Sequence, residues 1–523
     1  MAATTVVAGI ASTGAVARAT NSSPPTLNFD AAAIDEAVEG VLAQTTTPGA
    51  VVLLRQGDTE YLQAYGTRQY GGGAAVTVGD HFRIGSNTKT MTGTVILQLV
   101  DEGELALDDP VSDFVPEVPN GENITITQLL NMRSGLHNYS ELVSFNRMLD
   151  EDPQRAWQPE ELVAMGVAEE PYFAPGNGFH YSNTNTVLLG MIIEQITGNS
   201  AADEFRTRIF EPLGLDDTLL PALDDPSLPE PHPQGYLWGT NESTALDAVL
   251  PADEQEAALA GEIEPNDVTE ANPSWGWTAG AGISTAGDLA TYVEAMIGGG
   301  LLSDELQDLR LDSLEPVEDD NPQAAQYGLA IARLGPLLGH DGSLPGFQSV
   351  MGHDPDTGLT MIVLTNLQAA PDGQQTANLL AQTLIPVLYT DPATTPATTI
   401  DEPVTATDLA AGEYDEPVEI SVGDGDGVQV VFREIVLPPG SRTGEHCHHG
   451  QLVAVVKQGE LTHYAPVYPD GVRVYQEGDA IIEGADYVHE GVNEGTEDVV
   501  LWVTYIIEAD EPLAETDLTR CAD

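Results

Sequence analysis

The sequence predicts an α/β domain with a mostly helical second lobe, followed by a small all-β barrel. Two alternating apolar segments precede a helical one, a long helical stretch follows, and strand-like segments return before residue 390. Residues 391–407 are rich in Pro and Thr and lack periodicity, as expected of a linker. Over residues 408–523, short apolar runs alternate with glycine turns and helical periodicity is almost absent, which is typical of a barrel or jelly roll.

The composition is strongly acidic. Of the 523 residues, 83 are Asp or Glu and 17 are Lys or Arg, so the net charge is −66. Because 41% of the residues are hydrophobic, the acid belongs to the surface of a folded protein rather than to a disordered chain. Such a surface repels itself in dilute buffer and is screened at molar salt, which predicts a halophilic protein. The same charge excludes nucleic acids and anionic membranes as partners.

Residues 1–30 are expected to be a leader or a truncated signal segment, because the first 29 residues contain no Asp or Glu. Ala15-Val16-Ala17 resembles a cleavage site of small residues, whereas the basic segment expected before the apolar run is missing. A signal peptide, which predicts a secreted or cell-surface protein, and a disordered Ala/Thr tail, which is compatible with the cytoplasm, are the two alternatives. The run is too short and too polar to span a bilayer, and no membrane span is expected elsewhere.

The first domain is expected to span residues 31–390. Residues 28–42 have the pattern of an amphipathic helix capped near Asp30, and two alternating strands follow around a Gly57-Asp58 turn. Residues 123–135 predict another helical stretch further along the chain.

The central feature of this domain is Ser86, followed three residues later by Lys89, one of only two lysines in the chain. An accidental Ser-x-x-Lys is expected in fewer than about one in ten chains of this composition. Residues three apart lie on the same face of a helix, and the apolar positions from Met91 to Val100 have helical spacing. Ser86 is therefore expected at the amino end of a buried helix, where Lys89 can accept its proton if burial lowers the lysine pKa.

Two further segments carry polar residues that suit the same chemistry. Tyr181 and Asn183 precede an apolar helix expected to begin near Thr184; a phenol can relay a proton and an amide can hold a substrate carbonyl. Taken alone, this pattern is more typical of a helix-capping turn. His340, in the sequence HDG, lies between two short apolar runs that predict adjacent strands, and a histidine in a strand is usually structural.

Together and in this order, these segments resemble the serine β-lactamase and penicillin-binding family, in particular its class C β-lactamase and D-Ala-D-Ala carboxypeptidase branch. The resemblance covers about residues 31–390. It implies the β-lactamase/transpeptidase-like fold, in which an antiparallel sheet is flanked by helices and joined by a helical lobe. The segments that carry it are FRIGSNTK, LQLVDEGELALDDPVSDFVPEV, ITITQLLNMRSGL, YSNTNTVLLGMIIEQITG, RIFEPLGLDDT, SWGWTAGAGISTAGDL and HDGSLPGF.

The resemblance implies an acyl-serine hydrolase without a cofactor in this domain. By this resemblance, Ser86 would be the acylated nucleophile and Lys89 its proton partner. The backbone N–H groups of Ser86 and Ser343 would form the oxyanion hole.

Tyr181 would carry the proton to the leaving group and Asn183 would hold the substrate amide, while His340 stands where many members carry Lys. Asp341 departs from the pattern, because penicillin-binding members usually place Thr or Ser there to bind a substrate carboxylate. Unless Arg333 lies between them, a carboxylate at this position repels another, which favours a D-aminopeptidase or a neutral-ester hydrolase.

In the second domain, the sequence GEHCHHGQ places His446 and His448 two apart in a predicted strand, with Cys447 on the opposite face. His489 follows in a later segment, and three imidazoles on one interior surface are a metal-site composition. The two cysteines of the chain, Cys447 and Cys521, define no disulfide framework. A single bond between them and two free thiols are the alternatives.

These histidine segments resemble a cupin. Gly478, Asp479, His489 and Asn493 match its second motif, whereas Gln451 occupies the position of the usual Glu in the first. The resemblance implies a divalent metal held by three histidines with Gln451 or water. A metal-free barrel is the alternative, because such motifs can persist structurally.

The predicted function is a halophilic acyl-serine hydrolase that acts on amide or ester bonds of a small molecule or short peptide, as a D-amino acid peptidase, an esterase or a β-lactamase. Two alternatives remain. The first is a ligand sensor without turnover, motivated by Asp341 and Gln451. The second gives the principal chemistry to the C-terminal domain as a metal-dependent oxygenase or isomerase. Oligomeric state is not determined by the sequence.

Overall fold

The computed structural model describes residues 27–317, 325–389, 428–444, 446–468, 471–483, 487–495, 499–508, 515 and 518–521. The predicted linker and nearly all of the predicted leader lie outside these residues, so both stay predictions. The chain divides into two compact units, Met1–Ala397 and Thr398–Asp523. No helix among the described residues has both the length and the apolar content needed to cross a bilayer.

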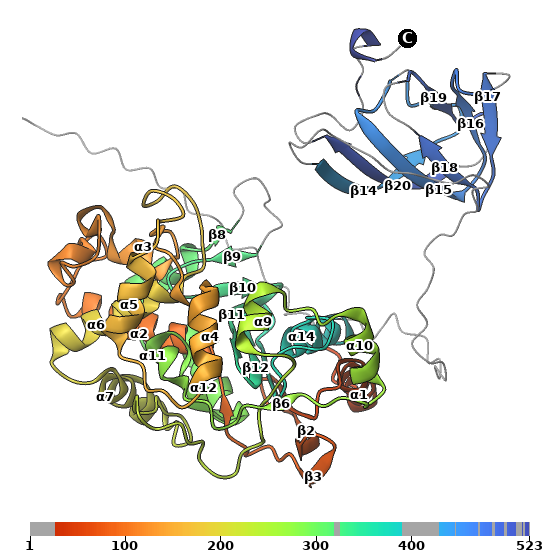
Figure 1. Ribbon diagram of the computed structural model, residues 1–523. Coiled ribbons are helices and arrows are strands. Elements are labelled where there is room, and N and C mark those ends of the chain that lie inside the picture. Colours follow the sequence, from red (N-terminus) through yellow and green to blue (C-terminus); the bar gives the residue numbers. More distant parts are fainter. Residues whose placement is uncertain are drawn as a thin grey trace, which may run out of the picture. The chain divides into compact units, whose positions relative to one another are not determined.

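A nine-stranded antiparallel sheet forms the centre of the first unit (Figure 1). Its order is β3-β2-β1-β13-β12-β11-β10-β9-β8, so strands from both ends of the unit meet where β1 pairs with β13. The predicted strands around the Gly57-Asp58 turn are β1 and β2, which confirms this part of the analysis. The strands are β1 Gly49–Gln56, β2 Thr59–Gln69, β3 Gly72–Ala75, β8 Glu315–Pro316, β9 Gln326–Tyr327, β10 Ala332–Leu334, β11 Leu337–Leu344, β12 Phe347–His353 and β13 Leu359–Thr365.

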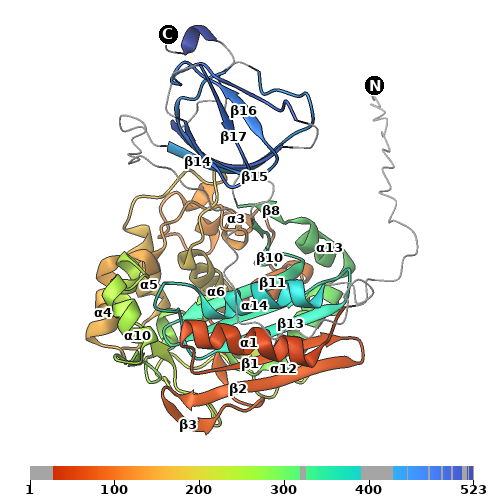
Figure 2. The ribbon, with the colours of Figure 1, turned by 90° about the vertical axis from the view of Figure 1, so that its right-hand side faces the viewer.

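Helices α1 (Ala31–Thr45) and α14 (Thr376–Leu388) cover one face of this sheet (Figure 2). As predicted, Asp30 caps α1, its carboxylate accepting from the N–H of Ala32. Alternate residues of β1 face opposite sides: Val52 packs with α1 and α14, whereas Val51 packs with the core of the helical lobe. Both faces of the central strands are therefore buried, which explains their continuous apolar sequence.

The other face of the sheet and the helical lobe carry the remaining helices. They are α2 Asn87–Asp101, α3 Ile126–Leu130, α4 Val143–Glu151, α5 Pro159–Val167, α6 Asn183–Thr197, α7 Ala201–Phe205, α8 Glu211–Leu213, α9 Asn241–Leu246, α10 Ala252–Leu259, α11 Trp277–Gly280, α12 Ala286–Gly298 and α13 Asp304–Asp312. Short pairs β4 (Phe82–Arg83) with β7 (Ile283–Ser284), and β5 (Tyr236–Leu237) with β6 (Asn266–Asp267), join loops around them.

The helix expected over residues 123–135 is much shorter in the structure, where only α3 is helical. Thr125 begins it with a capping box completed by Gln128. Met132 has a φ of 61°, a left-handed conformation that an α-helix does not accommodate. The apolar pattern of this segment reflects burial of a turn rather than a longer helix.

The segment before α2 lies unusually close to β11. A Cβ on Gly342 would stand 2.0 Å from the carbonyl oxygen of Ile84, and one on Gly85, whose φ is +52°, would stand 2.7 Å from the amide nitrogen of Ser343. Only glycine fits at these two positions. The two glycines thereby let the amino end of α2 meet the edge of the strand that carries Ser343.

The described residues of the second unit are β-rich, as predicted, with one short 3-10 helix at Leu518–Arg520. Its strands form two sheets, β14-β20-β15-β18 and β17-β16-β19, which share one apolar core. The ladders among the described residues do not close these sheets into a single hydrogen-bonded barrel. A disulfide bond joins Cys447 to Cys521. The strands are β14 Val428–Leu437, β15 Gly450–Gln458, β16 Leu461–Tyr464, β17 Val472–Tyr475, β18 Ala480–Glu483, β19 Glu490–Val492 and β20 Val499–Glu508.

Candidate active site

A cavity of about 340 Å³ opens at the amino end of α2. It is lined by residues from the helical lobe, from β11, from α9 and from the short helix η5 (Pro273–Trp275). Four of the six residues predicted to be catalytic line it: Ser86, Tyr181, Asn183 and Ser343. Segments far apart in the sequence therefore meet at one cavity.

Lys89 lies directly beneath Ser86 and has no exposed surface. Its Nζ is 3.0 Å from Ser86 Oγ, 2.6 Å from Asn183 Oδ1 and 2.7 Å from the carbonyl oxygen of Ala279 in α11. The helical spacing deduced from the sequence thus brings hydroxyl and amine into direct contact.

Burial holds the pKa of Lys89 well below the usual 10.5, and the nearby Asp341 carboxylate acts in the opposite direction. A neutral amine has two N–H donors and one lone pair. Because Asn183 Oδ1 and the Ala279 carbonyl can only accept, they take the two donors. The lone pair is then directed at the Ser86 hydroxyl, which is the arrangement required to take its proton.

Tyr181 covers this pair, with its ring centroid 4.7 Å from Lys89 Nζ. Burial raises the pKa of its phenol well above 10, while the neighbouring Ser86 hydroxyl lowers it. The phenol therefore keeps its proton near neutral pH and can supply one to a leaving group.

Asn183, the first residue of α6, is held by residues of the short helix η3 (Tyr139–Glu141) and the residue before it. Its backbone N–H donates to Asn138 Oδ1 over 3.1 Å and its Nδ2 donates to Ser140 Oγ over 2.8 Å. Asn138, Ser140 and Glu141 also line the cavity. Nothing in the periodicity of their NYSE sequence pointed to a site, so sequence reasoning missed them.

Glu141 is fixed by three partners. Tyr172 Oη donates to its carboxylate over 2.6 Å, Asn138 Nδ2 donates over 3.1 Å, and His180 Nε2 lies 3.1 Å away. Although partial burial opposes it, these contacts lower the pKa of Glu141. The cavity wall therefore carries an ionised carboxylate at neutral pH.

The sequence analysis expected His340 at the site, in the place where many members of the family carry Lys, but the structure places it outside the cavity wall. It is not among the residues that line the cavity, and its ring lies 6.0 Å from the ring of Tyr181. Its Nδ1 donates to the Asp341 carbonyl over 2.6 Å, which leaves Nε2 to accept from Tyr327 Oη at 3.2 Å. The His340 ring thus lies next to the Tyr181 ring. Its hydrogen-bond donor is Tyr327, a residue that no sequence pattern marked.

Asp341 also points away from the expected place. Its carboxylate accepts from Asn378 Nδ2 of α14 over 2.8 Å and does not line the cavity. Arg333 donates to Gln326 over 2.9 Å and does not line the cavity either. The Asp341 carboxylate is therefore not at the cavity wall, where it was expected to repel a substrate carboxylate.

The amino end of α2 is tied to the sheet beside Ser343. Asn87 Nδ2 donates to Ile84 O over 3.1 Å and to Ser349 Oγ in β12 over 2.7 Å. With the close approach of Gly85 to the Ser343 amide, these bonds fix Ser86 next to β11. A helix amino end beside a strand amide suits a developing oxyanion.

Comparison with known proteins identifies this architecture. Residues 34–385 match the family described as Beta-lactamase. The chain belongs to this family. It is similar to penicillin-binding protein 4* of Bacillus subtilis, with 27% identity over 370 residues that cover 69% of this chain and 77% of the relative. These findings make the protein an acyl-serine hydrolase of the β-lactamase and penicillin-binding family.

Two solved structures are also similar to this chain. A D-stereospecific amidohydrolase from Streptomyces has 32% identity and a TM-score of 0.57, over 68% of this chain and 97% of the other. A D-amino acid amidase from Ochrobactrum anthropi has 27% identity and a TM-score of 0.56, over 68% and 97%. The β-lactamase/transpeptidase-like fold predicted from the sequence is thereby confirmed.

In the second unit, three of the four predicted metal ligands converge. Candidate ligand atoms of His446, His448 and His489 lie within 4.8 Å of one another. His446 forms an isolated β-bridge with His489, and neither His446 nor His448 lies in a continuous strand. Gln451 is not brought to them: Leu452 and Ala454 of β15 line the histidine cavity, and side chains alternate along a strand, so Gln451 lies on the opposite face.

The buried amine predicts a specific pH dependence. If neutral Lys89 is the base, kcat/KM should rise with pH around a midpoint well below 10.5, and Asp341→Asn should move that midpoint to lower pH, because it removes the charge that raises the lysine pKa. Asparagine retains an acceptor for Asn378. The measurement is the pH profile of kcat/KM for both proteins; an unmoved midpoint would contradict the assignment of Lys89.

Proposed function

We propose that the protein hydrolyses amides of D-amino acids, or short peptides that begin with one, by acylation of Ser86. The observation that carries this proposal is the contact between Ser86 Oγ and the fully buried amine of Lys89, whose pKa burial lowers. The amidohydrolase and D-amino acid amidase to which the chain is similar support the choice of substrate.

In the proposed acylation, Ser86 Oγ forms a bond to the substrate carbonyl carbon while its proton passes to Lys89 Nζ. The resulting oxyanion is held by the backbone N–H groups of Ser86 and Ser343. The C–N bond then breaks, and the leaving amine takes a proton from Tyr181, which Lys89 re-protonates. Water attacks the acyl-enzyme by the reverse relay and restores Ser86.

The charges of the cavity wall favour a substrate with an ammonium group. Among the described residues that line it there is no Arg, Lys or His, and Glu141 is the only carboxylate. An α-carboxylate, as in penicillins or a D-Ala terminus, finds no cation on this wall. An α-ammonium finds Glu141, whose lowered pKa keeps it charged.

The proposal is tested on one purified preparation with D-phenylalanine amide, L-phenylalanine amide, a chromogenic cephalosporin and a short-chain ester. The D-amide should be the best substrate, and Ser86→Ala should lower kcat/KM by at least about 10³-fold. Ser144→Ala, on the exposed face of α4, is the matched control. A Ser86-dependent mass adduct without turnover would instead support the ligand sensor, and no adduct with any of these compounds would refute the proposed nucleophile.

Glu141→Gln tests the substrate class. It should raise KM for D-phenylalanine amide by about 10-fold or more, the loss of one charge-assisted hydrogen bond, while hydrolysis of the N-acetylated amide or the ester changes little. Glu151→Gln, at the exposed end of the following helix α4, serves as the control. Equal losses on charged and uncharged substrates would show that Glu141 has only a structural role.

We also propose that the protein works in concentrated salt. With 83 acidic and 17 basic residues, its negative field raises the proton affinity of Lys89 and opposes folding, and salt screens both effects. Activity should rise at least ~3-fold between about 0.1 and 2 M KCl, with circular dichroism recording the fold. Constant activity of a folded protein over this range would contradict the adaptation.

A further inference from the structure

A second cavity, of about 360 Å³, lies beside the catalytic cavity in the first unit. Two residues, Leu149 of α4 and Asn241 of α9, line both cavities. The cavities therefore adjoin at these two side chains, where α4 packs against α9 (Figure 1). A substrate too long for the catalytic cavity can extend past this junction into the second one.

The junction between the two cavities is held in place by Asp150. Its carboxylate accepts from the backbone N–H of Asn241 over 2.9 Å, from Asn241 Nδ2 over 2.7 Å and from the backbone N–H of Glu242 over 2.8 Å. The Glu242 carboxylate in turn pairs with Arg147 of α4. Because these contacts tie the amino end of α9 to α4, the connection between the cavities is a fixed feature of the fold.

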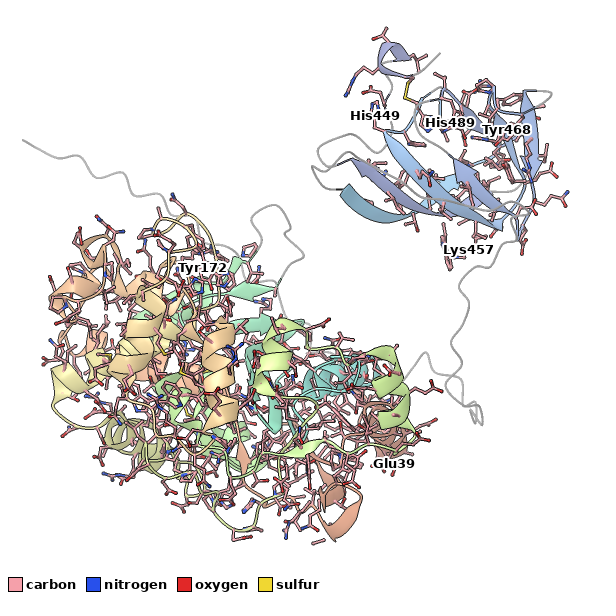
Figure 3. All side chains as sticks on the ribbon, in the orientation of Figure 1. Glu39, Tyr172, His449, Lys457, Tyr468 and His489 are labelled. Carbon is pink, nitrogen blue, oxygen red and sulfur yellow. A yellow bond between two sulfur atoms is a disulfide. The ribbon has the colours of Figure 1, made fainter. Side chains whose placement is uncertain are left out.

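The direction of α4 indicates which part of a substrate reaches the second cavity. Glu141, which accepts a hydrogen bond from Tyr172 (labelled in Figure 3), precedes this helix. Asn146 and Leu149, three residues apart and so on one helix face, follow it along the wall of the catalytic cavity. An α-ammonium at Glu141 places the substrate Cα at the start of this wall. The side chain on that carbon can then run along α4 to the second cavity, whereas the leaving amine faces Tyr181.

The wall of the second cavity is amphipathic. Its apolar side chains are those of Leu149, Pro153, Leu237, Val268 and Ala271. Three carboxylates, those of Asp150, Asp267 and Glu270, share the wall, and among the described residues that line it there is no Arg, Lys or His. A flexible group with an apolar stem and a cationic tip matches such a wall, as the side chains of arginine and lysine do.

The two carboxylates beyond the junction are Asp267 and Glu270. Asp267 is oriented by Thr269, whose backbone N–H donates to its Oδ1 over 3.0 Å, and Glu270 is exposed. Glu270 also interacts with the guanidinium of Arg83. That guanidinium is buried, donates to the backbone carbonyls of Thr269 and Ala271, and does not line the cavity. The wall therefore presents negative charge and no positive charge to a ligand.

We propose that the second cavity is the subsite for the side chain of the D-residue, and that it selects long side chains with a cationic tip, as in D-arginine amide and D-lysine amide. This inference rests on the proposed hydrolysis of D-amino acid amides at Ser86 and names the side chain that the site takes. The methylene stem lies on the apolar wall, and the cationic tip meets Asp267 and Glu270. A side chain as short as that of D-alanine stays in the catalytic cavity and gains nothing from these carboxylates.

The proposal is tested with D-arginine amide and D-citrulline amide, which have the same length and differ in the charge of the tip. In about 2 M KCl, which screens the attraction of remote surface charge, kcat/KM should be at least about 5-fold higher for D-arginine amide. This ratio should fall below about 2-fold in Asp267→Asn/Glu270→Gln, in which asparagine keeps an acceptor for Thr269. Glu264→Gln, an exposed residue of the same segment that lines neither cavity, should keep the wild-type ratio. Should the double variant fail to fold, Glu270→Gln alone should lower the ratio.

A binding measurement separates failure of this inference from failure of the proposed function. Calorimetry on full-length Ser86→Ala gives Kd for both amides without turnover, and it should show the same preference for D-arginine amide. Equal values for the two amides, or a preference that persists in Asp267→Asn/Glu270→Gln, would overturn the subsite, while hydrolysis of D-phenylalanine amide would still uphold the proposed function. If no D-amide were hydrolysed, the proposed function would fail, and the two Kd values would decide whether the cavity binds a cationic tip.

Discussion

The burial of one amine organises the first unit. Lys89 has no exposed surface, and a charged ammonium in such a place costs several kcal/mol unless it is paired. The structure surrounds it with three oxygens, from Ser86, Asn183 and Ala279. These oxygens can hydrogen-bond the amine in either protonation state, but none of them carries a charge that would pair with an ammonium. Three helices, α2, α6 and α11, must therefore meet within hydrogen-bonding distance of a single nitrogen, and that requirement fixes where Ser86 stands.

The same requirement explains the backbone on the other side of Ser86. For its hydroxyl to face Lys89 while its amide faces the cavity, the segment before α2 must lie against β11, where Gly85 and Gly342 leave no room for a Cβ. Asn87 and Ser349 then tie that segment to the sheet. The proposed oxyanion site is thus built from the packing of a helix end on a strand, which leaves substrate choice to the outer wall where Glu141 lies.

Chemistry and periodicity coincide in the segment of Ser86 and Lys89, and the structure brings these two side chains into contact. Tyr181 and Asn183 were singled out by the family resemblance, and the structure places them at the same cavity. Sequence reasoning missed residues whose position depends on a partner from a distant part of the sequence. Glu141 depends on Tyr172 and His180, and Tyr327 reaches His340 across the sheet. Such pairings depend on which distant segments the fold brings together, and a local sequence pattern carries no information about that.

A similar limit explains the metal-site residues. Spacing identified His446 and His448, but assigned Gln451 by motif position, although strand alternation directs Leu452 and Ala454 to the cavity instead. The β15 residues that line this cavity are therefore apolar, and His463 of β16 adds a fourth imidazole to its wall. This histidine cavity measures only about 40 Å³, whereas the 340 Å³ at Ser86 leaves room for an organic substrate.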